Sequence, residues 1–513
     1  MVTSLIVCLA AAQAAQQTLK VDPLMIASAD EVWSVIGQAR NPVWPGWDAR
    51  TTPVLVYFPD KQDVLINHPK PPEGFVPYKG ALKSSIGPIF VRDGKTTFDQ
   101  DGQNTSTEVG GVETLVVADT RSTLRQRVQS LPPNADPQNI ADNLAFDPYD
   151  HMQMVAHEAF HVYQNRRAPD KGANEQALFR YPTLSVENNV GYALEGKCLA
   201  AALRAKTDAD ARVQAAKWLA ARMTRHAALT QADRDYEDGN EFNEGLAKYV
   251  EYKLLQVLPG HKPGAAMWWL AGFHGYDDLS KEIDAKIAEM VGYTDGSRPV
   301  NNDPYGSSPV RFRLYYTGMA VGALLDRLGA KWHDRIFEKG VTLTSLATEA
   351  LHLSAADLEA AKAKLKTSSG YDALVQAKQK LAADGAVYVQ SLLDGLAKAP
   401  AELVIDFSKL KDPKPVFAYT PFGILRIDED RNFFRLVPLR GRLGTTLFGQ
   451  KQAAPALYDR KAKQMRLPLD AEPKDIQTGE VTAEVYRLPG VSLNKLKGTV
   501  RVEGRVVTVV LSD

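Results

Sequence analysis

The hydrophobic periodicity of this chain changes twice, and these changes constrain its fold more than any other feature. Up to about residue 130, short β-branched runs bounded by Pro, Gly and Asp are typical of strands. Between about 147 and 400 the apolar residues recur with helical spacing, and after Pro400 the strand pattern returns. The sequence therefore predicts an α+β fold with a strand-rich part, a helical part and a small all-β part.

These changes give a domain plan and a set of expected elements. We predict a strand-rich lobe over 24–146, a helical lobe over 147–399 and a β domain over 400–513. In the first lobe we expect a helix over 29–39 and strands over 54–58, 87–91 and 114–118. In the second we expect helices over 148–165, 183–205, 208–229, 232–257, 262–272, 278–291, 310–328, 331–338, 355–366 and 371–397. In the third we expect a two-sheet sandwich with strands over 403–407, 417–419, 423–427, 433–437, 479–486 and 498–511.

The composition excludes several classes of protein. The 513 residues contain 61 Lys and Arg against 61 Asp and Glu, so the chain has no overall basic field for binding nucleic acid. No internal apolar run is long enough to cross a bilayer, so no membrane span is expected. Hydrophobic residues make up 44% of the chain and are spread along it, which argues against disorder.

The N-terminus indicates export. Residues 5–12 form a short apolar run, and Ala12-Gln13-Ala14 fits the small-residue pattern of a signal-peptide cleavage site. We therefore predict a signal peptide over 1–14 and a secreted or periplasmic protein, the alternative being an uncleaved apolar N-terminus. Removal of Cys8 with this peptide leaves Cys198 alone, and its apolar surroundings predict a small core residue.

The strongest local motif is His157-Glu158-Ala-Phe-His161, which lies in a predicted helix with a well-marked start. Asp147 suits the N-cap and Pro148 the first helical position. Residues i and i+4 share a helical face, so His157 and His161 can bind one metal ion. Zinc is a suitable ion, because it commonly binds imidazole nitrogens. Glu158 is rotated by about 100° from His157, where its carboxylate can take a proton from the water that the metal binds.

A third protein ligand is needed, and two predicted helices each offer a glutamate. One helix carries Asn243-Glu244-Gly and then Glu251, and the other carries Glu195. Glu251 lies about two turns beyond Glu244 on the same face, where it can orient a ligand histidine. A long stretch with two predicted helices separates His161 from Glu244, so Glu195 stays open as the alternative ligand.

H-E-x-x-H followed by N-E-G-x-A-x-Y-x-E resembles the gluzincin zinc metallopeptidases, in particular their aminopeptidase-N-like branch. The resemblance implies a thermolysin-like catalytic domain, with a strand-rich N-terminal lobe and a mostly helical C-terminal lobe. It also implies that His157, His161 and Glu244 bind one Zn²⁺ ion and that Glu158 is the general base.

A third segment extends the resemblance. Tyr315-Tyr-Thr-Gly318 is similar to the Y-x-x-G helix of the family, which implies that Tyr315 stabilises the oxyanion of the tetrahedral intermediate. Tyr316 is the neighbouring alternative. The resemblance covers about residues 110–345, and we find no G-x-M-E-N segment, which in that family holds the free amine of the substrate. It therefore implies a peptidase without implying an aminopeptidase.

Weaker features have simpler interpretations. We expect His151 on the helix surface rather than at the metal. We expect Trp268 and Trp269 in the core rather than in a substrate cleft. Arg311 and Arg313 can bind a substrate carboxylate, but we expect them to be solvated or paired with acidic side chains.

Together these features predict an exported zinc peptidase that hydrolyses a peptide or protein substrate and binds no nucleic acid. Two alternatives stay open. One is a non-catalytic surface binding or adhesion protein with a degenerate metallopeptidase domain. The other is a zinc hydrolase that cleaves a non-peptide amide or ester on the same site.

Overall fold

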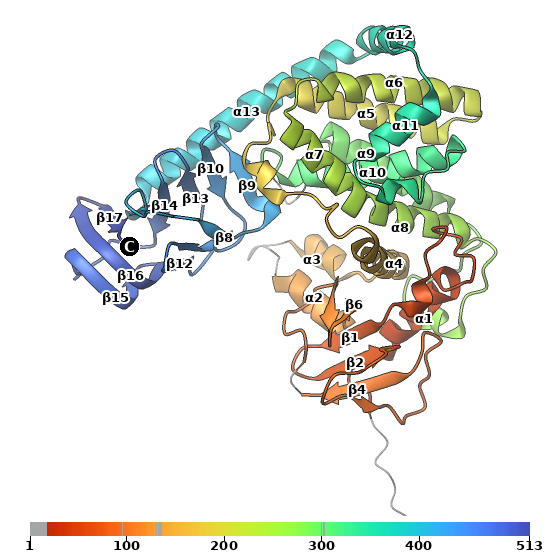
Figure 1. Ribbon diagram of the computed structural model, residues 1–513, viewed down its shortest axis with the longest axis horizontal. Helices are drawn as coiled ribbons and strands as arrows, with labels where there is room; N and C mark the ends of the chain where they lie inside the picture. Colours follow the sequence, from red (N-terminus) through yellow and green to blue (C-terminus); the bar gives the residue numbers. More distant parts are fainter. Residues whose placement is uncertain (1–17, 95, 130, 132–135, 299, 301–302) are drawn as a thin grey trace, which may run out of the picture. The chain divides into compact units, whose positions relative to one another are not determined.

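A computed structural model describes residues 18–513 except 95, 130, 132–135, 299 and 301–302. The predicted signal peptide lies outside these described residues. The chain combines helices with strand-rich sheets and ends in an all-β region, which confirms the predicted α+β composition (Figure 1). It folds as two compact units, one made of the chain up to Asp170 with Val250–Ile283, the other of Lys171–Tyr249 with Asp284–Asp513.

The first unit is built on a mixed sheet. Its six described strands lie in the order β3-β4-β2-β1-β6-β5, and β1 pairs antiparallel with β2 and parallel with β6. The central strands are buried because their sequences are almost continuously apolar. The strands are β1 (Val54–Phe58), β2 (Gln62–Ile66), β3 (Val76–Pro77), β4 (Ile89–Asp93), β5 (Thr105–Val109) and β6 (Val112–Ala118).

Helix α4 of the first unit packs against β5, β6 and helix α1. Its start is fixed as expected, because the Asp147 side chain accepts hydrogen bonds from two backbone amides and Pro148 occupies the first turn. Phe160 anchors the middle of α4 against the rings of Trp44 and Trp47. The α-helices that lie wholly in this unit are α1 (Pro23–Ile36), α2 (Thr120–Gln129), α3 (Pro137–Leu144) and α4 (Pro148–Arg167).

The second unit contains the antiparallel pair α5 and α6, which lie side by side in Figure 1. Helix α10 packs against α5 and α11, and α12 packs against α6. The helices that belong to this unit or enter it are α5 (Val186–Arg204), α6 (Asp208–His226), α7 (Gln231–Asn240), α8 (Leu246–Val257), α9 (Ser280–Asp295), α10 (Ser308–Arg327), α11 (Leu343–Leu351), α12 (Ala355–Lys366) and α13 (Tyr371–Lys398).

One helical run continues without a break from α7 through a π-helical turn, η3 (Glu241–Gly245), into α8. The residues at both ends of the π-turn keep right-handed helical angles, so the helix axis is not interrupted. This run confirms the helix predicted over 232–257. A π-turn inserts one extra residue into a helical turn and is frequent at functional sites.

The C-terminal region forms one continuous hydrogen-bonded sheet, which corrects the expected two-sheet sandwich. The described strands follow the order β8-β11-β12-β16-β17-β7-β14-β13-β10-β9, and β15 pairs with β16. The last strand, β17, pairs in parallel with the first strand, β7, and this pairing joins the two ends of the region. The strands are β7 (Ala401–Asp406), β8 (Val416–Ala418), β9 (Ile424–Arg426), β10 (Arg431–Phe434), β11 (Arg440–Leu443), β12 (Thr446–Gln450), β13 (Ala456–Asp459), β14 (Gln464–Leu469), β15 (Gly479–Leu488), β16 (Val491–Glu503) and β17 (Val506–Leu511).

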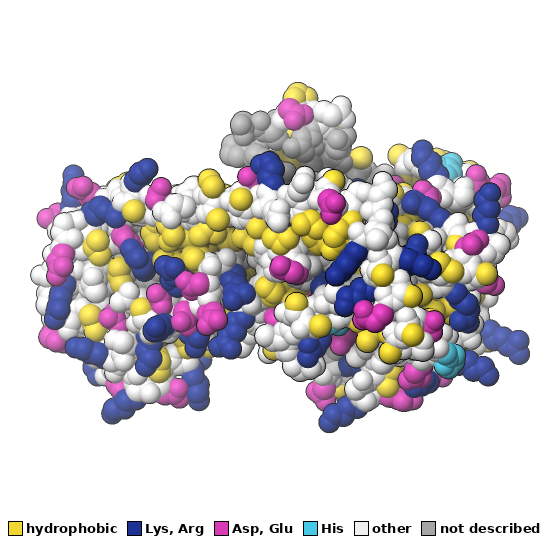
Figure 2. All heavy atoms as spheres, turned by 90° about the horizontal axis from the view of Figure 1, so that it is seen from above, with side chains coloured by type: hydrophobic (Ala, Val, Ile, Leu, Met, Phe, Trp, Pro, Cys, Tyr) yellow, Lys and Arg dark blue, Asp and Glu magenta, His cyan; other side chains and the backbone are white. Residues whose placement is uncertain are grey.

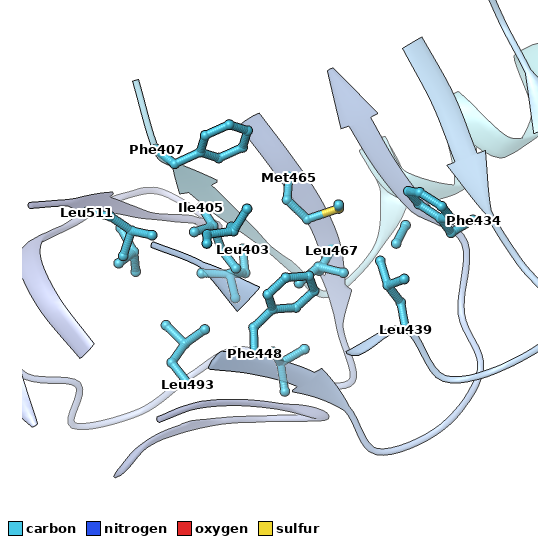
Figure 3. Close-up of a cluster of buried hydrophobic side chains, with 14 of the residues drawn as sticks. Leu403, Ile405, Phe407, Phe434, Leu439, Phe448, Met465, Leu467, Leu493 and Leu511 are labelled. Carbon is cyan, nitrogen blue, oxygen red and sulfur yellow. The ribbon is translucent and has the colours of Figure 1, made fainter. Parts of the chain in front are cut away.

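The sheet encloses an apolar core. Side chains from strands far apart in sequence, such as Leu403, Phe448 and Leu467, point toward one another in Figure 3 and are fully or almost fully buried. On another face, Leu396 and neighbouring residues of α13 cover a second cluster that includes Phe433.

Several expected elements differ from the observed ones. The helix expected over 262–272 is wrong, because only the short 3-10 turn η4 (Ala265–Trp269) forms there, between Pro263 and Gly272. Helix α2 lies where strands were expected. The single strand expected over 498–511 is interrupted by a turn at Gly504, whose φ of 57° favours glycine.

The surface agrees with the balanced composition. Basic and acidic side chains are mixed across the face drawn in Figure 2. None of the described helices combines the length and the apolar character that a membrane span needs.

Candidate metal centre

His157 and His161 project from the same face of α4, as the i, i+4 spacing predicts. The centroids of their rings are 4.7 Å apart, and the rings meet edge to face. His157 is almost fully buried, with 10% of its side chain exposed. Two imidazoles at this separation can bind a single ion, because each contributes a ligand nitrogen about 2 Å from a zinc ion.

A hydrogen bond at Nδ1 orients each ring. Nδ1 of His157 lies 2.7 Å from Oε1 of Glu251, a residue of α8 in the same compact unit. Nδ1 of His161 lies 2.9 Å from Oε1 of Gln164, one turn further along α4. Because these oxygens accept hydrogen bonds, the Nδ1 atoms carry the protons and the Nε2 atoms carry the lone pairs that bind a metal. The contact between His157 and Glu251 confirms the expected position of Glu251.

Glu244 lies on the same helical run as Glu251, within the π-turn η3. One ligand atom each from Glu244, His157 and His161 lies within 4.8 Å of the other two. The predicted ligands are therefore brought together, and two histidines with one carboxylate are a donor set that suits zinc. The residues present thus fit the metal that the sequence implies.

The glycines of two sequence motifs explain how α10 reaches the π-turn. A Cβ atom on Gly245 would lie 2.7 Å from Cα of Gly318, and one on Gly318 would lie 2.7 Å from Cα of Gly245. The backbones of η3 and α10 therefore touch where both residues lack side chains. The N-E-G and Y-x-x-G segments, far apart in the sequence, meet at this contact.

The contact places polar side chains of α10 beside Glu244. Nη2 of Arg311 lies 3.0 Å from Oε1 of Glu244, and Arg311 also pairs with Glu175. Burial and the Glu244 carboxylate, with which its hydroxyl forms a hydrogen bond, raise the pKa of Tyr315 well above its usual value. Tyr315 therefore stays protonated at neutral pH and can donate a hydrogen bond. Its neighbour Tyr316 donates to Glu289 at 2.7 Å instead.

Glu195, the alternative ligand, is fully buried and paired with two arginines. Nε of Arg222 donates to one of its oxygens at 2.5 Å, and Nε of Arg225 donates to the other at 2.6 Å. Although burial opposes ionisation, these guanidinium groups lower the pKa of Glu195 below its usual range. Both carboxylate oxygens are thus engaged, which favours Glu244 as the ligand.

The same arginines hold the π-turn. Arg222 makes a two-pronged contact with Glu241, the first residue of η3, at 2.8 and 3.0 Å. Thr317, which lies in α10, donates its hydroxyl hydrogen bond to Glu241 at 2.5 Å. The sequence did not predict this network of ion pairs, because buried pairs between separate helices leave no local sequence pattern.

Two expectations about other residues are wrong. His151 is half-buried rather than fully on the surface: its Nδ1 atom lies 2.9 Å from the Ser28 hydroxyl, and burial lowers its pKa to about 4. Trp268 and Trp269 are 59% and 81% exposed rather than in the core. By contrast, Cys198 is buried as expected, and burial raises its pKa to about 11.

Comparisons with protein-family models, with curated proteins and with solved structures give no match for this chain.

Proposed function

We propose that this protein is an exported zinc-dependent peptidase of the gluzincin type, with a thermolysin-like catalytic domain. The observation that carries the proposal is the grouping of His157, His161 and Glu244, whose ligand atoms lie within 4.8 Å of one another. A zinc ion held there supplies Lewis acidity, which polarises a carbonyl group and lowers the pKa of water.

The protein's own residues then divide the work of hydrolysis. Glu158 follows the first ligand on α4, and we assign its carboxylate the role of accepting a proton from the attacking water and passing it to the leaving nitrogen. Glu251 keeps the ring of His157 in the ligand orientation. Tyr315 is protonated and hydrogen-bonded to Glu244, and its single O–H would turn from Glu244 to the oxyanion that develops on the carbonyl.

The decisive variant is Glu158→Gln, which keeps the shape of the side chain but removes the base. We expect it to retain one zinc ion per chain and to lose peptide hydrolysis by a factor of about 10² to 10⁴. Metal analysis and turnover of a mixed peptide library measure the two properties on the same preparation. Glu73→Gln, at an exposed loop position, serves as the control and should match the unaltered protein.

The outcome separates the alternatives. Equal turnover by Glu158→Gln and the control would contradict the role of Glu158. Zinc binding without turnover of any peptide would favour a binding protein, and turnover of esters or non-peptide amides alone would favour the other zinc hydrolase.

A further inference from the structure

A cavity lies within the second compact unit, among the end of α9, the start of α10 and the middle of α13. Its volume is about 240 Å³. Four basic side chains line it, Arg298, Arg313, Lys378 and Lys380, with Asp384 as the acidic one. The sequence singled out Arg313 as a possible anion ligand, and the proposed hydrolysis makes no use of it.

Arg313 is a buried cation without an acidic partner. Only 2% of the residue is exposed, and its Nε atom donates to the backbone oxygen of Tyr293 at 3.1 Å. Within the described chain no carboxylate lies at ion-pair distance, and its terminal nitrogens make no hydrogen bond. Burial lowers the pKa of Arg313 because it disfavours the charged form, and the more distant charge of Asp295 offsets this only in part.

Lys378 has the same character. It is 6% exposed, and its ammonium group donates to the backbone oxygen of Asp295. It forms no ion pair with any described residue. Burial lowers the pKa of Lys378, and the nearby charge of Arg313 lowers it further. Two buried like charges therefore lie along one cavity.

Other cations at this cavity and in the core of this unit are neutralised by carboxylates. At the same cavity, Lys380 pairs with Asp384 at 2.7 Å and Arg298 pairs with Glu289 at 3.2 Å. The fully buried Arg222 and Arg225 contact two glutamates each. The unbalanced charge of the cavity thus belongs to Arg313 and Lys378.

We propose that this cavity is a phosphate-binding site, in which Arg313 and Lys378 together hold the dianionic group of inorganic phosphate or of a small phosphate monoester. A guanidinium group binds two phosphate oxygens at once, and an ammonium group supplies a second positive charge. A phosphate monoester carries a charge between about −1.5 and −2 at neutral pH, and the dianion of either phosphate balances both cations, whereas a monocarboxylate balances only one. The apolar walls, Pro304, Pro309 and Leu381, leave room for a small organic group.

Isothermal titration of the full chain with inorganic phosphate, at constant ionic strength, tests this proposal. We expect one site per chain, with acetate binding at least tenfold more weakly. Titration with glycerol phosphate identifies the source, because tighter binding than inorganic phosphate indicates a monoester and weaker binding indicates the free ion. Failure of both phosphates to bind would overturn the proposal.

Variants locate the site. Arg313→Met and Lys378→Met should each weaken phosphate binding by at least tenfold, whereas Arg335→Met, at an exposed pair with Glu349, should not change it. Since each Met variant removes an uncompensated buried charge, both should melt at the same or a higher temperature than the unaltered protein in phosphate-free buffer. Unchanged phosphate affinity in both variants would place the ion elsewhere and contradict the proposal. This test is independent of peptidase activity.

Discussion

At the scale of single residues, the candidate centre depends on hydrogen bonds that orient the ligand side chains. The clearest is the contact between Nδ1 of His157 and Glu251, because both groups are largely buried. Such a partner fixes the ring and increases the basicity of the other nitrogen. The sequence indicated Glu251 through its helical spacing from Glu244, whereas the role of Gln164 on His161 had no signal beyond proximity along α4.

We predict that Glu251→Ala lowers the affinity for zinc by about 10- to 100-fold, since His157 then loses its orienting partner. Competition with a chelator of known affinity measures this change. Glu251→Gln keeps an oxygen that accepts the hydrogen bond and should lose less, and the exposed Glu73→Ala should lose nothing. Identical affinities in all three variants would show that Glu251 does not support the metal ligand.

A second residue-scale prediction concerns pH. Burial lowers the pKa of His151 from 6.5 to about 4, so the unfolded chain binds this proton at a higher pH than the folded chain. The stability contributed by the neutral ring is therefore complete above pH 6.5 and is lost as the pH falls from 6.5 to 4, by up to about 3 kcal/mol.

Urea unfolding at pH 7 and pH 4.5 measures this effect. We expect His151→Gln to lose less of its free energy of unfolding between the two pH values than the unaltered protein. His274→Gln, at a side chain 56% exposed, should behave like the unaltered protein. The same pH dependence in His151→Gln and the unaltered protein would argue against a buried neutral ring.

At the scale of elements, the contact between α10 and the π-turn η3 sets the position of Glu244. A Cβ atom at residue 318 would lie 2.7 Å from Cα of Gly245 and 2.9 Å from the backbone oxygen of Glu241. All of these are backbone atoms, which cannot move aside as a flexible side chain can. The contact therefore links the fold to the metal site.

We predict that Gly318→Ala lowers the free energy of unfolding by about 1–3 kcal/mol and also weakens zinc binding. The matched control is Gly395→Ala in α13, where no atom lies within 4 Å of the added Cβ. This control should be neutral or stabilising, because alanine favours helix over glycine by about 1 kcal/mol. If Gly318→Ala proves as stable as Gly395→Ala and binds zinc equally well, the close contact is not needed.

The sequence predicted elements well where the apolar pattern is continuous. Helix α4 begins where Asp147 and Pro148 indicate, and the run from α7 to α8 matches its predicted bounds. Helix α2 was missed because its sequence is mostly polar and offers little apolar periodicity. Strand β2 was missed because it buries Gln62 and Asp63, whose side chains bond to other segments rather than to water.

At the scale of the whole molecule, the sequence predicted the class of secondary structure but not how the strands pair. The closing contact of the C-terminal sheet joins β17 to β7 in parallel, and no local pattern specifies such a distant partner. The apolar core there also includes Tyr192 and Leu314 from helices, so it is not confined to the β region. The domain boundary expected near residue 400 therefore stays a prediction.

In the candidate site, too, some features could be predicted from the sequence and others could not. The spacing of His157 and His161 follows from the α-helix alone, and it could be predicted from the sequence. The choice between Glu195 and Glu244 could not be made from the residues alone, because it depends on Arg222 and Arg225 arriving from α6 to engage Glu195. Long-range ion pairs of this kind become visible only in three dimensions.

The central claim is that His157, His161 and Glu244 hold one zinc ion. Anomalous diffraction from crystals of the zinc-loaded protein, recorded on both sides of the zinc absorption edge, tests it most directly. We predict one strong peak per chain, about 2.0–2.2 Å from a nitrogen of each histidine and from an oxygen of Glu244. A peak bound by other residues, or no peak in protein that hydrolyses peptides, would contradict the claim.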